Sequence, residues 1–182
     1  MSTSTIRCPW AGDPLSIDYH DLEWGVPVHD DHELVEFLSA EFFQAGLSWV
    51  TILKKRENFR RAFDGFDYQK IARYGQDKIN TLLKDSGIIR NRRKIGAAVQ
   101  NARAFMDIQD HFGSFDQFIW SFVNHQPVDN QWKTMEQVPA STKLSDAITK
   151  DMKRRGFTFF GTTICYAYMQ AIGMVNDHLV DC

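Results

Sequence analysis

Hydrophobic residues recur at steps of three and four along most of the chain, which is the periodicity of helices with one buried face. The predicted helices begin near Asp31, Ser48, Asp67, Ile79, Arg92, Ser114, Ser145 and Thr162, and the last is expected to run to about Val175. Strand patterns are scarce, and the one short candidate, Phe157–Phe160, has no obvious partner. The pattern therefore predicts an all-α fold built from many short helices.

Length and composition are those of one globular domain. The chain has 182 residues, 43% hydrophobic and 24% charged, and a domain holds roughly 150 residues. The five prolines lie in connecting stretches and no repeat or linker divides the chain, so residues 1–182 are expected to form a single domain. Residues 124–144 have few apolar positions and predict a long surface connection, a kind of segment that is often functional.

The sequence shows no targeting or membrane segment. No stretch approaches the ~20 apolar residues of a membrane helix, and residues 1–7 form no apolar signal region. We therefore expect a soluble, cytoplasmic protein without a membrane partner. The net charge of -2 argues against general coating of nucleic acid but is compatible with a local basic face. The three cysteines are too few for a disulfide framework, and Cys165, in an apolar segment, is expected to be an inert core residue.

Four candidate metal ligands lie at the two ends of the chain. Cys8 and His20 are near the start, and His178 and Cys182 are four residues apart at the end, where a helix would turn both toward one ion. Two cysteines and two histidines are a ligand set of structural zinc and leave no open position for catalysis. Joining the two pairs costs about 4–5 kcal/mol of chain entropy, less than the ~10 kcal/mol that structural zinc supplies. The spacing alone also fits a buried histidine with unrelated cysteines.

A basic turn surrounds Gly87. From Lys84 to Lys94 the sequence holds five basic residues and one acidic residue. Two helices joined by a tight glycine turn expose backbone N–H groups at the start of the second helix, which suits a phosphate. The side chains expected to add Coulomb attraction for a phosphate are Arg90, Arg92, Arg93 and Lys94. A second basic cluster at 150–155 also favours a phosphate site. The alternative to a phosphate site is an ordinary solvated face at a helical corner.

Aromatic and acidic residues are interleaved in the first fifty positions. The aromatic residues are Trp10, Tyr19, Trp24 and Trp49, and they flank Glu23 and Glu41. Glu41 falls in the apolar stripe of its predicted helix, where a carboxylate is costly unless it is paired or faces a cleft. Aromatic faces with one carboxylate suit a flat ring that is electron-poor or cationic, which stacks on the aromatic rings and donates exocyclic N–H groups to the acid. The alternative is core packing with a glutamate that faces solvent.

Several long motifs resemble those of one known family of DNA repair enzymes. They occupy residues 18–27 (DYHDLEWGVP), 41–57, 120–125 (WSFVNH), 155–157, 161–166 and 175–178 (VNDH). Together they span nearly the whole chain. The resemblance is to the 3-methyladenine DNA glycosylase I family, the constitutive alkylation-repair glycosylases.

The resemblance implies an all-α, helix-hairpin-helix DNA glycosylase whose termini are joined by one structural zinc ion. The family's zinc ligands fall on Cys8, His20, His178 and Cys182. The base-contacting acid falls on Glu41 and the stacking aromatics on Tyr19 and Trp49, while Trp24 and Trp10 match positions near the pocket. Three positions depart from the family pattern. Ser16 stands where members carry tyrosine, so one pocket contact of the family is not expected here. Phe42 and Phe43 replace smaller or polar residues after the acid and are expected to reshape the pocket wall.

The DNA contacts follow from the same resemblance. The basic turn, within an element of about 79–105, matches the family's DNA-anchoring hairpin with Gly87 at its centre. The loop at 44–48, which contains Gly46 and Leu47, is the expected wedge that fills the gap left by a flipped base. The implied partner is double-stranded DNA that contains 3-methyladenine, and the protein is expected to act as a monomer.

The implied reaction is hydrolysis of the N-glycosidic bond. Methylation at N3 makes adenine cationic and a good leaving group, so the enzyme mainly has to flip and hold the base. Flipping costs a few kcal/mol, which stacking at about 1–3 kcal/mol per aromatic contact offsets. No lysine lies in a Schiff-base motif, so free 3-methyladenine should leave without strand cleavage. Two rival hypotheses are a DNA-binding module without base release and a zinc hydrolase of small molecules.

Overall fold

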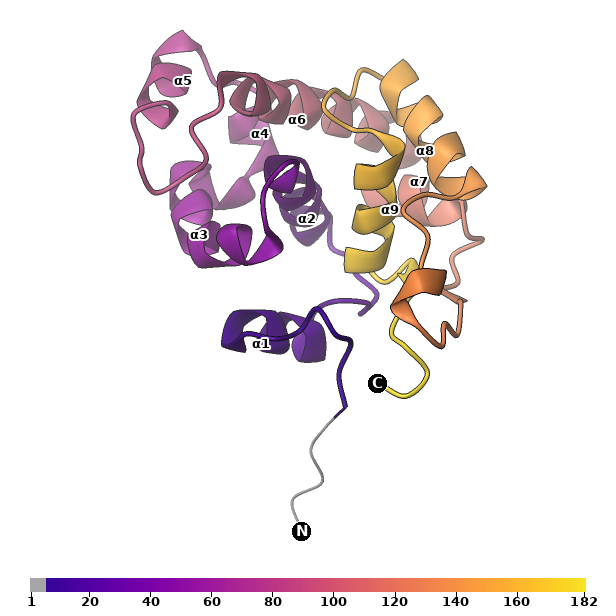
Figure 1. Cartoon of the computed structure of the whole chain (residues 1–182). Coiled ribbons are helices and arrows are strands. Elements are labelled where there is room, and N and C mark those ends of the chain that lie inside the picture. Colours follow the sequence, from indigo (N-terminus) through magenta and orange to yellow (C-terminus); the bar gives the residue numbers. More distant parts are fainter. Residues whose placement is uncertain (1–5) are drawn as a thin grey trace.

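The computed structural model describes residues 6–182, so positions 1–5 of the polar N-terminal stretch lie outside the described residues. Its elements, in order, are α1 (Pro14–Leu22), α2 (Asp31–Gln44), α3 (Trp49–Ala62), the 3-10 turn η1 (Asp64–Phe66), α4 (Tyr68–Ile71), α5 (Gln76–Leu82), α6 (Arg92–Phe112), α7 (Phe115–Ser121), β1 (Val128–Asp129), the 3-10 turn η2 (Met135–Gln137), α8 (Lys143–Arg154), α9 (Thr162–Ala171) and β2 (Val175–Asn176). The prediction of a mostly helical fold is confirmed (Figure 1).

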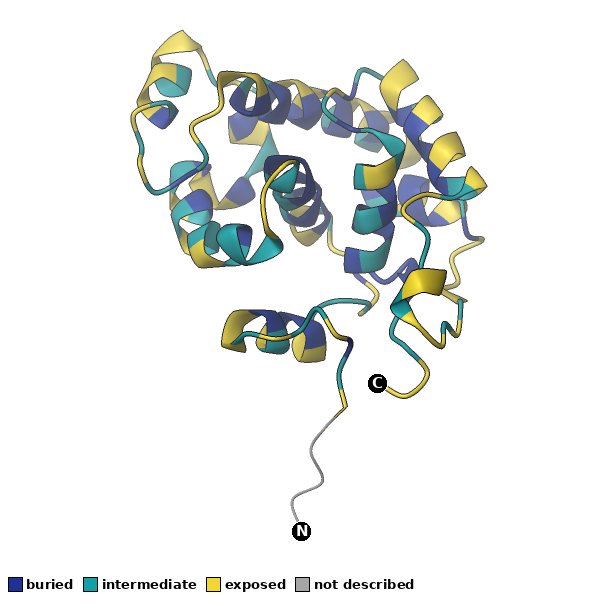
Figure 2. Cartoon of the chain, in the orientation of Figure 1, coloured by how far each residue is buried: buried dark blue, intermediate teal, exposed yellow. Residues whose placement is uncertain are grey.

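Helix α2 forms the centre of the fold. Asp30 begins it by accepting hydrogen bonds from the backbone N–H groups of His32 and Glu33, as an N-cap residue does. Its apolar side chains are buried against α3, α6, α7 and α9. The sides of α2 and α6 that face inward are buried and their outer sides are exposed (Figure 2). Most of the largest buried side chains are aromatic, so flat rings fill most of this core.

Three predicted elements differ from the structure. The segment Phe157–Phe160 is not a strand, and Phe159 has a positive φ. The Asn101 side chain accepts a hydrogen bond from the Thr158 N–H and donates one to the Thr158 carbonyl, so neither group is available for strand pairing. The last helix ends at Ala171 rather than near Val175, which belongs to β2 and pairs in parallel with Val128 of β1. Helix α8 begins at Lys143, ahead of the expected Ser145, because Thr142 and Ser145 form a capping box.

Helix α1 has no counterpart among the predicted helices. Asp13 caps it and Pro14 occupies its first position, but its buried residues, Ser16, Tyr19 and His20, are not aliphatic. No apolar stripe therefore marks it. It lies to one side of α2 and α3, close to the C-terminal end of the chain (Figure 1). In the described part of the chain, no helix combines the length and apolar character needed to cross a membrane.

Candidate functional site

A cavity of about 280 Å³ lies where α1, the end of α2, α9 and the connection after α7 meet. Five of its lining residues are those that the sequence predicted: Trp10, Tyr19, Trp24, Glu41 and Trp49. Residues that the sequence did not single out complete the wall: Gln44, Met135, Val138, Ala167, Gln170 and Asp177. Met135 and Val138 come from the long connection at 124–144, so that segment contributes directly to the cavity.

Glu41 is the acid of this cavity. It lies in the last turn of α2 and is 5% exposed, and burial alone raises the pKa of its carboxyl to about 8. Within residues 6–182, no side chain or backbone group forms a hydrogen bond with this carboxyl. Glu41 is therefore largely neutral at pH 7, with its hydrogen-bonding capacity open to a ligand.

The aromatic rings form one wall of the cavity. Tyr19 and Trp49 have ring centroids 5.1 Å apart at an angle of 46°, and Trp10 lies edge-on to Trp24 at 5.0 Å. At 5.1 Å the first two rings touch each other and admit no third ring between them, so a base stacks against this wall rather than inside it. The Tyr19 hydroxyl and the Trp49 Nε1 are buried and have no hydrogen-bond partner among the residues that the structure describes, so a ligand can satisfy both groups.

Asp177 is a buried carboxylate that sequence reasoning missed. Its Oδ1 accepts hydrogen bonds from Asn130 Nδ2 at 2.7 Å and Trp132 Nε1 at 2.8 Å, and its Oδ2 accepts from the Tyr166 hydroxyl at 2.6 Å and Gln170 Nε2 at 2.8 Å. Four donors on two oxygens compensate for the burial of the charge. This one side chain thus fixes the connection at 124–144 to α9. Its place inside the VNDH motif, next to the candidate ligand His178, was the available signal.

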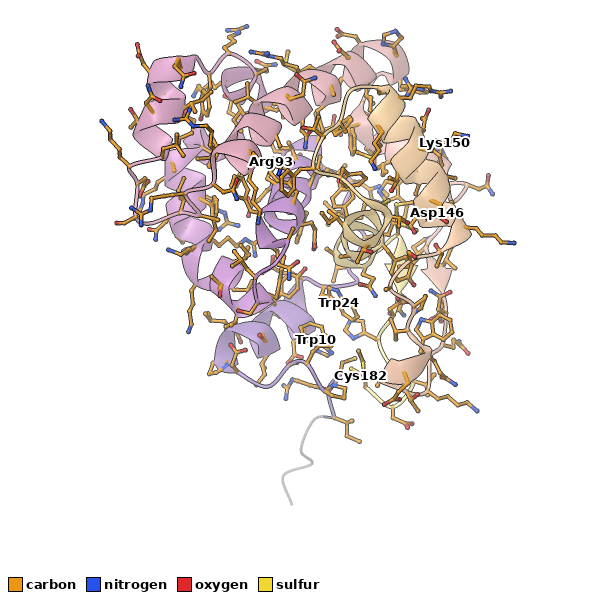
Figure 3. The ribbon with its side chains drawn as sticks, turned by 45° about the horizontal axis from the view of Figure 1, so that its top comes forward. Trp10, Trp24, Arg93, Asp146, Lys150 and Cys182 are labelled. Carbon is orange, nitrogen blue, oxygen red and sulfur yellow. The ribbon has the colours of Figure 1, made fainter. Side chains whose placement is uncertain are left out.

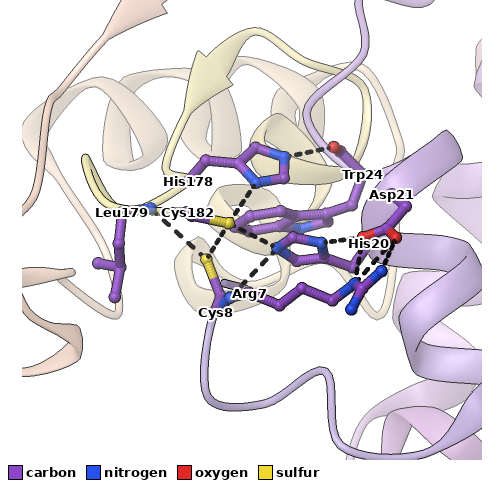
Figure 4. Close-up of polar contacts among 8 residues, drawn as sticks. All are labelled: Arg7, Cys8, His20, Asp21, Trp24, His178, Leu179 and Cys182. Atoms are coloured by element: carbon purple, nitrogen blue, oxygen red, sulfur yellow. Dashed lines mark hydrogen bonds and ion pairs between the residues drawn. The ribbon is translucent and has the colours of Figure 1, made fainter. Parts of the chain in front are cut away.

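The four candidate metal ligands come together in space. The Sγ and ring nitrogen atoms of Cys8, His20, His178 and Cys182 all lie within 4.8 Å of one another (Figure 4). Cys182 Sγ is 3.5 Å from Cys8 Sγ, 3.1 Å from His20 Nε2 and 3.5 Å from His178 Nδ1. A tetrahedral zinc ion with its usual bond lengths separates its ligand atoms by about 3.3–3.8 Å. The donor set is one that structural zinc uses, and the two 3.5 Å distances lie in this range, so the cluster is compatible with a metal site.

The histidines are oriented by groups outside the cluster. His20 Nδ1 lies 2.8 Å from Asp21 Oδ1, which can only accept, so His20 Nε2 is left for a metal. His178 Nε2 lies 2.9 Å from the Trp24 carbonyl, which leaves Nδ1. Such partners fix the ring orientation at metal sites. Arg7 in turn binds Asp21 and, with His20, lowers the pKa of that carboxyl to about 2.

The prediction that a helix turns two of these ligands toward one ion is wrong. His178 and Cys182 are not on a helix; they lie in irregular chain after β2, and turns bring their side chains together. Trp24 connects the cluster to the cavity, because its carbonyl binds His178 while its indole lines the cavity. Figure 3 shows Trp10, Trp24 and Cys182 in one region of the molecule, away from Lys150 and Asp146 on α8.

The basic turn is a hairpin between α5 and α6, at residues 83–91. The backbone N–H groups of Ile89, Arg90 and Arg92 form no hydrogen bond within the described residues. A side chain at Gly87 would place its Cβ 3.0 Å from the Asp85 side chain and 3.1 Å from the Asn58 side chain of α3, so both side chains would have to shift. The side chains of Arg90, Arg92 and Arg93 are exposed, as an anionic partner requires.

The sequence predicts that Lys94 contacts DNA, but its side chain is buried. It is only 5% exposed, and its Nζ donates to the carbonyls of Phe43 at 2.7 Å and Ala45 at 2.6 Å. Burial lowers the pKa of its ammonium group. Its amine therefore points into the protein, toward the end of α2, and is not presented to a phosphate.

The predicted wedge loop is a tight turn. The Leu47 N–H donates to the Gln44 carbonyl at 2.7 Å, and Gln44 Nε2 donates to the Leu47 carbonyl at 2.6 Å. Ala45 has φ -46 and ψ 119 and Gly46 has φ +80, which are the angles of a type II turn and require glycine at the second central position. Leu47 is left 38% exposed, an apolar side chain on the surface beside the cavity residue Gln44.

The departures from the family pattern lie outside the cavity wall. Phe42 and Phe43 are buried in the core, where Phe43 packs on Phe59 and Phe63, and Ser16 is buried and binds Asp13 at the start of α1. None of these three residues lines the cavity. Cys165 is fully buried, and burial raises the pKa of its thiol to about 12, which agrees with an unreactive core residue.

Comparisons with known proteins agree with one another. Residues 10–182 match the family model for methyladenine glycosylase. A protein from Escherichia coli (strain K12) named DNA-3-methyladenine glycosylase 1 is 52% identical over 177 residues, which cover 97% of this chain and 95% of that protein. A protein from Haemophilus influenzae named DNA-3-methyladenine glycosylase is 49% identical and covers 98% of this chain and 97% of its own.

A crystal structure of a 3-methyladenine DNA glycosylase I superposes with a TM-score of 0.94 at 50% identity and covers 97% of this chain and 98% of that one. Staphylococcus aureus supplies a further similar structure, described as the structural basis of 3-methyladenine recognition by its 3-methyladenine DNA glycosylase I. That structure has a TM-score of 0.92 at 36% identity, with 94% of this chain and 91% of the other covered.

Proposed function

The chain belongs to the methyladenine glycosylase family, which consists of N-glycosyl hydrolases, and from this premise we propose that it flips N3-methyladenine out of double-stranded DNA and hydrolyses the N-glycosidic bond without cutting the strand. The proposal includes one glycosylase domain over residues 1–182 that acts as a cytoplasmic monomer. Free 3-methyladenine is the released product.

The observation that carries this proposal is the unpartnered carboxyl of Glu41 inside an aromatic cavity. A base methylated at N3 is cationic, and its N6 amino group donates hydrogen bonds. When such a base enters, the ionised carboxylate accepts from N6–H and attracts the positive charge, strongly because water is excluded. A neutral adenine does not offset the cost of ionising a buried acid. Glu41 thus favours the alkylated base over the normal one.

The aromatic wall holds the base while the bond breaks. Stacking against Tyr19 and Trp49 offsets the cost of flipping, at about 1–3 kcal/mol per aromatic contact. The electron pair of the C1′–N9 bond moves onto the cationic base, which leaves neutral, and water adds to C1′ and loses one proton to solvent. The positive charge that develops on the sugar is next to the DNA phosphates. The enzyme therefore needs little acid–base power, and no lysine intermediate forms.

The DNA contacts belong to the hairpin and the wedge turn. The free N–H groups of the hairpin and the exposed side chains of Arg90, Arg92 and Arg93 bind phosphates of the backbone, as in a helix-hairpin-helix element. Leu47, the last residue of the turn beside the cavity, fills the gap left by the flipped base. The exposed leucine and the rigid turn at Gly46 support this role.

A structural zinc ion fits the cluster at the chain ends. Cys8, His20, His178 and Cys182 would hold it, and the ion supplies cross-linking of the two ends, not chemistry on the substrate, because four protein ligands fill a tetrahedral shell. Trp24 and Trp10 are positioned next to these ligands and line the base cavity. A metal ion that holds these ligands together would therefore also fix the part of the cavity wall formed by Trp10 and Trp24.

Release of free base from methylated duplex DNA, followed by chromatography, tests the proposed function. The wild-type protein releases 3-methyladenine, and Glu41→Gln loses release while it keeps most of its DNA affinity. Glu33→Gln, an exposed change on the same helix, is the matched control and stays active. An unchanged rate for Glu41→Gln removes this residue from the site.

The same assay separates the rival hypotheses. A binding module binds DNA in a salt-sensitive way without releasing any base. A zinc hydrolase of small molecules loses activity on chelation before it unfolds, whereas here chelation unfolds the protein first. Borohydride treatment during the reaction should trap no covalent complex with DNA, and a trapped adduct would contradict simple hydrolysis.

A further inference from the structure

The buried amine of Lys94 lies between the hairpin helix and the wedge turn. Lys94 is in the first turn of α6, directly after the exposed Arg92 and Arg93. Its side chain crosses to the end of α2, where Nζ donates to the Phe43 and Ala45 carbonyls. A buried ammonium is costly unless its hydrogen bonds are made, so these two contacts are the reason it can stay there.

The Ala45 carbonyl is the part of the turn that sets its type. In a β-turn, types I and II differ by a flip of the central peptide, which here joins Ala45 to Gly46. The oxygen of that peptide is the one that Lys94 holds at 2.6 Å. The second contact, to the Phe43 carbonyl, satisfies an acceptor in the last turn of α2 that has no helical partner.

We propose that Lys94 is a positioning residue that locks the turn at 44–47 in its type II form and so fixes Leu47 for insertion into DNA. This role rests on the proposed function, because it matters only if a base is flipped. Lys94 acts through Leu47 and touches neither base nor phosphate. It also links the helix that follows the DNA anchor to the turn that enters the duplex, so that binding at one presents the other in a fixed geometry.

Glu41 is not the residue through which Lys94 acts. The pKa of Glu41 is raised by burial, and the Lys94 amine binds the Phe43 and Ala45 carbonyls rather than this carboxyl. The base cavity should therefore keep its affinity for free 3-methyladenine when Lys94 is changed.

Lys94→Met removes the charge and both donors at nearly constant volume. We expect single-turnover base release to slow at least about tenfold, the factor that corresponds to one charge-assisted hydrogen bond. Binding of free 3-methyladenine should remain as in the wild type, and Lys94→Arg should restore part of the rate. The matched control is Arg93→Met, one residue earlier. As a phosphate contact it should reduce the salt dependence of DNA affinity, which Lys94→Met should not do.

A double-mutant cycle shows whether Lys94 works through Leu47. Leu47→Ala alone should slow release, and adding Lys94→Met to it should then slow release by less than about threefold. Full additivity of the two effects would overturn the positioning role. So would a reduced salt slope for Lys94→Met equal to that of Arg93→Met.

A second variant keeps the test decisive if Lys94→Met fails to fold. At Gly46 a Cβ meets nothing within 4 Å, so Gly46→Ala strains only the positive φ of the turn. It should slow release as Lys94→Met does, and an unchanged rate would show that the type II form is irrelevant. A wild-type protein that releases no base would overturn the proposed function itself, whereas active wild type with equally active Lys94→Met or Gly46→Ala overturns only the role of Lys94.

Discussion

Replacing Glu41 by glutamine should make the protein more stable while it abolishes base release. Burial raises the pKa of Glu41 from 4.5 to about 8, so the folded protein retains a proton that the unfolded chain has lost between these pH values. The stabilising contribution of the protonated carboxyl is complete below pH 4.5 and is lost as the pH rises toward 8. Glutamine matches the neutral acid in shape and does not titrate.

The size of the effect follows from 1.36 kcal/mol per pKa unit. The wild type should match Glu41→Gln near pH 4.5, be less stable by about 3 kcal/mol at pH 7, and reach a constant difference of about 5 kcal/mol above pH 8. Urea unfolding of both proteins from pH 5 to 9 measures this difference in the free energy of unfolding. All other titrating groups contribute equally in the two proteins, so their contributions cancel in the difference. Parallel stability curves across that range would refute the burial of an unpartnered carboxyl.

The other predictions concern the ring wall, the hairpin and the metal cluster. Trp49→Ala should weaken binding of free 3-methyladenine by about ten- to a hundredfold in calorimetric titration, the loss of one stacking contact, and a normal affinity would exclude this role. Gly87→Ala should weaken DNA binding, because its Cβ would lie 3.0 Å from Asp85; Gly12→Ala, with nothing within 4 Å, should not. A chelator should lower the Tm of the wild type but leave that of Cys182→Ser unchanged, and equal responses would argue against a metal at this cluster.

The sequence predicts the helices where a polar cap precedes an apolar stripe. Asp30 before α2 and Ser114 before α7 are such cases. The sequence does not predict α1, because the buried face of this helix is made of polar and aromatic residues and has no aliphatic stripe. Periodicity indicates burial against an apolar core, whereas α1 is buried against α3, the cavity and the cluster of candidate metal ligands.

Some residues of the candidate site can be predicted from the sequence and others cannot. Residues whose chemistry is unusual for their surroundings, such as an acid in an apolar stripe, are visible in the sequence, and Glu41 is one of them. The roles of Lys94 and Asp177 are not visible, because each depends on partners at least about forty positions away, apart from two donors of Asp177 on α9. A basic residue in a basic cluster predicts a surface contact, and only the path of the chain shows that its amine turns inward.

The contact between Cys8 and Cys182 joins positions 174 residues apart. During synthesis on the ribosome the helices α1 to α9 emerge before this contact is possible, since Asp177, His178 and Cys182 follow them in the sequence. A nascent chain that stops before residue 177 therefore carries the α5–α6 connection but lacks part of the cavity wall. We expect such a truncated translation product to bind DNA without a completed pocket for the base.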